Sequence, residues 1–327
     1  MNPKTSRRSN RKFTIAKAVK HQLMLKLLLS GPAGSGKTWC ALAMAEYIVQ
    51  NLPDDHNTNG RICLLDTEAN SASLYADRYD FDVLVMEPPF DPVDYIAAME
   101  MIVAQNYAVV IVDSVSHEWN GPGGCLSRVD ASTGNKHAAW KPVTQDHLAF
   151  VNEILWYPTH LILCGREKET TAQEKDDRGR NQVVKLGMQL EQRGGFDYEV
   201  QIHARFDMDH TLRVDKTRCT VVDSQTYQDA TDNRFISVVW QWLNSGEAQA
   251  DPQHFQRLIK TILGQWLVSA QAAGWVGEDP NERERKLLRS VVGDLYTELM
   301  ASQDDDEIKD IQARGLALIE AHKPSGV

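Results

Sequence analysis

The sequence lacks several features that would assign it to a specialised class of protein. It has 5 cysteines among 327 residues, and none of them forms a Cys-x-x-Cys pair. Disulfides and a zinc site are therefore not expected, and a reducing cytoplasm fits best. No run of about 18 apolar residues occurs, so we expect no membrane-spanning helix. The N-terminus has no apolar segment of the kind that a secretory signal needs.

Acidic residues are absent from the first 20 positions, although the whole chain is acidic, with a formal net charge of −10. This net charge argues against a protein that coats nucleic acid uniformly. The basic N-terminal segment predicts either a solvated flexible arm over residues 1–20, running into a short helix, or an arm that seeks phosphates. Its basic residues are Lys4, Arg7, Arg8, Arg11, Lys12, Lys17 and Lys20.

A glycine-rich segment follows a short apolar run and precedes a helical pattern. This segment fits the Walker A pattern G-x-x-x-x-G-K-[ST]. Glycines let backbone amides approach a polyphosphate, and a helix N-terminus favours anions. We expect Lys37 to reach the β- and γ-phosphates of a nucleoside triphosphate, and the Thr38 hydroxyl to bind Mg²⁺. The predicted cradle consists of Gly31, Pro32, Ala33, Gly34, Ser35, Gly36, Lys37 and Thr38.

Apolar strand patterns alternate with helical patterns up to about residue 165. The alternation predicts right-handed βαβ units and a mainly parallel sheet. A β-hairpin with alternating apolar residues between positions 198 and 214 is expected to extend this sheet. Helical spacing dominates the last part of the chain. We therefore predict an α/β core over residues 21–246 and a helical region of about three helices over 247–327.

Carboxylates end two of the predicted strands, at the edge where open α/β sheets contact ligands. Asp113 is placed to hold Mg²⁺ opposite the phosphate loop, although it could also be a simple turn cap. Because the next residue is Ser114 and not glutamate, a catalytic base must come from elsewhere. Glu68 is the best-placed candidate, unless it is a loop carboxylate in solvent. Glu118 is a weaker candidate for the same role.

Together these motifs resemble those of RecA-like recombinase ATPases. Residues 31–38 are similar to the Walker A motif, 66–68 to the strand end with the catalytic glutamate, and 109–114 to the Walker B motif. The resemblance implies that Arg166 stands where that family has a glutamine that senses the γ-phosphate. It also implies that the polar segment 167–182, expected to be structureless, is a mobile DNA-binding loop, although a solvated flap fits equally well.

A later strand pattern, residues 213–218, resembles the family strand whose two cations reach the ATP of a neighbouring subunit. By this match Lys216 and Arg218 are trans-acting fingers that stabilise charge on the γ-phosphate; the alternative is two exposed strand residues. Such fingers require head-to-tail assembly into a filament or ring. Residues 113–119, 140–144 and 209–212 are further similar to bacteriophage RecA-core ATPases of single-strand annealing and recombination.

The resemblance implies an ATPase that uses ATP and Mg²⁺, is stimulated by single-stranded DNA, and acts in recombination or annealing in a bacterial cytoplasm. A ring-shaped DNA translocase or helicase on the same core is a second hypothesis. A third is a nucleotide-gated interaction protein with negligible turnover, whose helical C-terminal region binds a protein partner. The polar segment is a weak DNA signal by itself, because it mixes acidic with basic residues and has no aromatic residue for base stacking.

Overall fold

The fold is known from a computed structural model of the chain. The structure describes residues 17–54, 56, 58–175, 181–247, 254–274, 292–302 and 305–321. The predicted N-terminal arm before residue 17 lies outside the described residues. Residues 17–20 have no regular secondary structure, so the short helix expected at the end of the arm is absent from them. Lys20 instead donates a hydrogen bond to the carbonyl oxygen of Trp242, at 2.8 Å.

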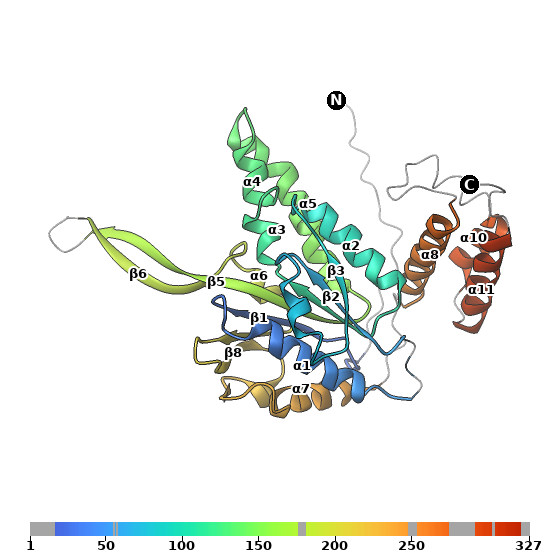
Figure 1. Cartoon of the computed structure of the whole chain (residues 1–327), viewed down its shortest axis with the longest axis horizontal. Helices are drawn as coiled ribbons and strands as arrows, with labels where there is room; N and C mark the ends of the chain where they lie inside the picture. Colours follow the sequence, from blue (N-terminus) through green and yellow to red (C-terminus); the bar gives the residue numbers. More distant parts are fainter. Residues whose placement is uncertain are drawn as a thin grey trace.

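A mainly parallel sheet forms the centre of the molecule (Figure 1). Its strand order is β3-β2-β4-β5-β1-β7-β8-β9, and within this series the β7–β8 and β8–β9 pairs are antiparallel while the others are parallel. The order confirms the predicted α/β fold and its hairpin extension, which is the β7–β8 pair. The strands are β1 (Lys26–Gly31), β2 (Ile62–Asp66), β3 (Asp82–Val85), β4 (Val109–Asp113), β5 (His160–Lys175), β7 (Ile202–Phe206), β8 (Leu212–Thr217) and β9 (Thr226–Tyr227).

Helices cover both faces of the sheet (Figure 1), which is why its central strands are almost continuously apolar. Helices α1 (Lys37–Gln50) and α7 (Arg234–Asn244) lie on one face, and α2 (Pro92–Ala104) and α5 (Lys136–Trp156) lie on the other. The remaining short helices are η1 (Ser71–Tyr75), α3 (Ser116–Asn120), α4 (Cys125–Asp130), α6 (Phe196–Glu199) and η2 (Thr220–Val222).

Side chains of β1 illustrate how one strand serves two apolar cores. Leu27 and Leu29 pack with the residues of α1 and α7, whereas Leu28 packs with those of α2 and α5. Successive side chains of a strand point to opposite faces, so the leucine run fills both layers. Helix α2 begins directly after Asp91, whose side chain caps it by accepting a hydrogen bond from the amide of Val93 at 2.9 Å.

The polar segment after Arg166 is a projecting two-stranded arm, and the expectation of a structureless stretch was wrong. Strand β5 continues beyond the sheet and pairs antiparallel with β6 (Asn181–Leu190), with a register shift after Thr170. The resulting ribbon extends away from the core (Figure 1). A ribbon outside the core needs no apolar face, so its sequence lacks the period-two alternation by which strands are recognised. Residues 176–180 lie outside the described residues.

The described part of the C-terminal region is mainly helical, as predicted. It contains α8 (His254–Ala272), α10 (Asp294–Ala301) and α11 (Asp305–Ala321), which share an apolar core around Trp266. Helix α8 packs closely on α2, since an added Cβ at Gly264 would lie 2.9 Å from the Cβ of Ala104. Residues 275–291 of the predicted helical region lie outside the described residues. In the described ranges, no helix combines the length and apolarity needed to cross a membrane.

Candidate nucleotide-binding site

The phosphate loop connects β1 to α1 at the carboxyl edge of the parallel strands. Gly34 and Gly36 have φ angles of +82° and +94°, in the region that favours glycine. At Gly31 a Cβ would lie 2.7 Å from the carbonyl oxygen of Phe206, so the loop starts tightly against the end of β7. The backbone therefore has the glycine-dependent shape that a Walker A cradle requires.

Two polar side chains of the loop suit a polyphosphate. The Lys37 ammonium is buried and donates hydrogen bonds to the carbonyl oxygens of Gly31, at 2.9 Å, and Pro32, at 2.8 Å. The Ser35 hydroxyl is also buried and has no hydrogen-bond partner among the described residues. Phosphate oxygens carry negative charge and are stronger acceptors for both groups than neutral carbonyls are. The loop thus fits the phosphates of a nucleotide.

Thr38 and Asp113 meet beside this loop, as a shared Mg²⁺ site requires. The Thr38 hydroxyl donates a hydrogen bond of 2.5 Å to Oδ2 of Asp113. Asp113 is buried, and this burial raises its pKa to about 6, while the hydrogen bond from Thr38 acts in the opposite direction. A carboxylate and a hydroxyl are oxygen ligands of the kind that Mg²⁺ takes together with phosphate oxygens.

Glu68 and Arg166 bind each other at the same edge of the sheet. Nε of Arg166 donates to Oε1 of Glu68 at 2.6 Å, and a second guanidinium nitrogen contacts Oε2. Arg166 is paired with Gly31 in the β1–β5 register, which places it beside the phosphate loop. The predicted base and the predicted sensor are therefore one ion pair, which the sequence could not reveal because 98 residues separate them.

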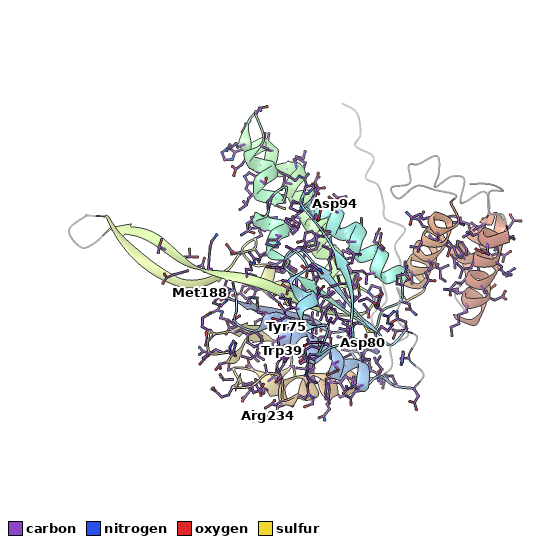
Figure 2. The ribbon with its side chains drawn as sticks, viewed as in Figure 1. Trp39, Tyr75, Asp80, Asp94, Met188 and Arg234 are labelled. Carbon is purple, nitrogen blue, oxygen red and sulfur yellow. The ribbon has the colours of Figure 1, made fainter. Side chains whose placement is uncertain are left out.

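The segment that carries Glu68 is held by two sets of contacts. The Asp66 carboxylate accepts hydrogen bonds from the backbone amides of Glu68, at 2.6 Å, and Ala72, at 3.1 Å. Trp39 of α1 packs on Tyr75, with ring centroids 5.4 Å apart (Figure 2). Sequence reasoning missed this aromatic pair, although Trp39 directly follows the Walker A threonine. The contacts fix Glu68 relative to the first turn of α1.

Glu118, the weaker candidate base, lies in a buried polar cluster and is poorly suited to activate water. Its carboxylate accepts hydrogen bonds from Sγ of Cys125, at 3.1 Å, and from Nε2 of Gln192, at 3.0 Å. Nδ1 of His147 lies 3.0 Å from the same carboxylate. Burial raises the pKa of the Cys125 thiol, which therefore remains a donor. The cluster links α3, α4 and α5 to the base of β6.

Lys216 and Arg218 lie at the opposite edge of the sheet from the phosphate loop of their own chain. Lys216 pairs with His203 at the start of β7, whereas the end of β7 lies beside the loop. The Lys216 ammonium donates to the backbone carbonyls of Tyr198, at 3.0 Å, and Val200. Any contact of these cations with ATP would thus involve a neighbouring chain, and the finger role stays a prediction.

The fold and the site together define a P-loop NTPase. A family profile described as AAA domain matches residues 24–235, which is more than half of the chain and runs from just before β1 to the start of α7. The chain belongs to the AAA domain family. No curated protein matches it. The matched span contains every described residue that contributes to the phosphate loop, the Thr38–Asp113 pair and the Glu68–Arg166 pair.

Proposed function

We propose that the chain hydrolyses ATP at this site and uses the reaction to act on single-stranded DNA, in recombination or annealing. The observation that carries the hydrolytic part is the 2.5 Å contact between Thr38 and Asp113 beside a Walker A loop. P-loop NTPases hold Mg²⁺ with the Ser or Thr of the phosphate loop and an aspartate at the end of a neighbouring strand, which is the arrangement of Thr38 and Asp113. Family membership supports the same reaction class.

In the proposed reaction the loop amides and Lys37 bind the β- and γ-phosphates. Thr38 and Asp113 would hold Mg²⁺, whose charge offsets the charge on the phosphate oxygens. Glu68 would orient a water molecule in line with the γ-phosphorus and accept its proton. The water oxygen would form a bond to the γ-phosphorus while the bond between the γ-phosphorus and the β–γ bridging oxygen breaks, so that ADP and inorganic phosphate are the products.

Arg166 would respond to the presence of the γ-phosphate by changing its binding partner. Its guanidinium binds Glu68 in a partly exposed pair, with 38% of the Arg166 side chain and 19% of the Glu68 side chain accessible. A γ-phosphate competes for the same guanidinium, because both partners are anions that take it in bidentate fashion. ATP binding would therefore draw Arg166 from Glu68 and leave the carboxylate to contact water.

The projecting arm supports the DNA part of the proposal. Strand β5 carries Arg166 at the sheet edge and continues without a break into the arm. Lys168 is the first arm residue with a largely exposed cation, 65% accessible, and it pairs with Glu191, which directly follows the partner strand β6. β-Ribbons are among the elements with which proteins contact nucleic acids. The proposed assembly is a filament or ring in which Lys216 and Arg218 approach the ATP of a neighbour.

ATPase turnover with and without single-stranded DNA tests the proposal. Three proteins are compared: wild type, Lys37→Ala, and a variant in which residues 171–186 are replaced by Asn-Gly. The two-residue turn joins Thr170 to Gly187, which are paired across the arm, so the core sheet is retained. We expect DNA to stimulate wild type, Lys37→Ala to lose turnover and nucleotide affinity, and the short-arm variant to keep only its basal rate.

The alternatives give different outcomes in the same experiment. Wild-type rates that do not change with DNA, at any length or salt concentration tested, would contradict the DNA part. Nucleotide binding without turnover would favour a nucleotide-gated interaction protein, with the helical C-terminal region as its docking surface. Unwinding of a forked duplex coupled to hydrolysis would favour a translocase or helicase.

A further inference from the structure

The turn between β7 and β8 contacts the phosphate loop from the side opposite the Glu68–Arg166 pair. Strand β7 runs parallel to β1, with Arg205 opposite Ser30, so the turn that follows β7 lies at the same edge as the loop. Nδ1 of His210 lies 3.1 Å from the carbonyl oxygen of Ser35. A Cβ placed on Gly36 would approach the same nitrogen to 3.2 Å. The imidazole is thus in direct contact with the Ser35–Gly36 peptide.

The backbone holds His210 in an unusual conformation for this contact. Its φ angle is +66°, in the left-handed region where residues other than glycine are uncommon. The turn is closed by main-chain bonds that do not involve the imidazole, from Asp207 N to Thr211 O and from His210 N to Asp207 O, both 3.0 Å. A side chain of His210 is therefore not needed to form the turn.

The contact with His210 determines how the Ser35–Gly36 peptide is oriented. A carbonyl oxygen only accepts hydrogen bonds, so the imidazole must carry its proton on Nδ1. The Ser35–Gly36 peptide is trans, and the C=O and N–H of a trans peptide point in opposite directions. Holding the Ser35 carbonyl toward His210 therefore turns the Gly36 amide away from His210, as the loop needs for an amide that is to meet phosphate.

We propose that His210 is a positioning residue of the nucleotide site, which orients the Ser35–Gly36 peptide for phosphate binding. The inference rests on the proposed nucleotide site and deepens it. It adds a third element, the β7–β8 turn, to the loop and to the strand ends that carry Asp113 and Glu68. The oriented peptide would bind the polyphosphate part of the ligand, so the affinities of ATP, ADP and inorganic pyrophosphate should all depend on His210.

A glycine substitution separates this role from folding. His210→Gly removes the imidazole at a φ angle that glycine adopts without strain, so the melting temperature should not fall. Loss of one positioning hydrogen bond should raise the Kd of fluorescently labelled ATP and ADP about three- to tenfold. Pyrophosphate, measured by displacement, should weaken by the same factor. Ser224→Gly is the matched control, since Ser224 is exposed at a φ of +56° on another turn and should bind like wild type.

A rescue variant tests the hydrogen bond itself. Asparagine tolerates the left-handed region and offers an amide donor, so His210→Asn should bind within about twofold of wild type. Wild-type affinity in His210→Gly, an equal loss in Ser224→Gly, or an undiminished loss in His210→Asn would each overturn the proposal. An effect on ATP and ADP without one on pyrophosphate would do the same. Wild type that binds no nucleotide would instead reject the nucleotide site.

Discussion

Replacing Glu68 with glutamine is the sharpest test of the proposed hydrolytic site. Glutamine preserves the size of the side chain and keeps an oxygen that can accept the 2.6 Å bond from Nε of Arg166. It removes the negative charge that would take a proton from water. A positioned general base contributes about 10²- to 10⁴-fold to a rate. At about 1.4 kcal/mol for each factor of ten, the barrier should rise by about 3–5.5 kcal/mol.

The same substitution should have little effect on folding or on nucleotide affinity. The Glu68–Arg166 pair is partly exposed, and such pairs contribute about 0–1 kcal/mol to stability. The loop, Thr38 and Asp113 are unchanged. We therefore expect kcat to fall at least 100-fold, the Kd of ATP to stay within about threefold, and the melting temperature to shift little. Phosphate release, labelled-nucleotide binding and thermal unfolding measure the three quantities.

Substitution of Arg166 provides a second test of the same site. Residues in direct contact are expected to show non-additive effects, and Arg166→Gln should lower kcat much less in the Glu68→Gln background than in wild type. Arg166→Gln should also reduce the preference for ATP over ADP, since the guanidinium would bind the γ-phosphate. A Glu68→Gln enzyme with kcat within threefold of wild type would refute the assignment of Glu68 as base. Strictly additive effects would refute the coupling to Arg166.

Two further predictions concern stability. Gly315→Ala should lower the free energy of unfolding of the C-terminal helices by about 1–3 kcal/mol, because the new Cβ would overlap the Trp266 ring. Gly134→Ala is the control, because no heavy atom lies within 4 Å of its added Cβ. Equal urea midpoints for the two variants would contradict the packing of Gly315 on Trp266. His160 accepts a 3.1 Å bond from the amide of Leu25 through Nδ1, and burial lowers its pKa to about 3. Below about pH 6.5, the ordinary pKa of a histidine, the His160 side chain binds a proton in the unfolded chain but stays neutral in the folded chain. The free energy of unfolding should therefore fall by up to about 1.4 kcal/mol per pH unit between about pH 6.5 and 3. His160→Asn should make the urea-derived slope shallower, and an unchanged slope would count against this role.

Much of the fold was predictable because its signals are local. The Walker A spacing, the short apolar strands that end at Asp66 and Asp113, and the cap at Asp91 each depend on neighbours within a few residues. The arm was not predictable in this way. Its strands pair with each other outside the core, so no buried face imposes alternation on them. The roles of individual site residues remain predictions that the proposed experiments test.

The sequence by itself determined that this chain has a phosphate loop in an α/β core and a helical C-terminal region, since spacing and periodicity suffice for both. Tertiary structure alone decided which side chains share the site. In the folded chain Glu68 binds Arg166, and Glu118 lies in a buried cluster. His210 contacts Ser35 of the phosphate loop, although 175 positions separate the two residues in the sequence. The physical reason is strand order and register. Parallel strands end at the same edge of the sheet, and which strand ends lie next to each other depends on pairings between segments that are far apart in the sequence.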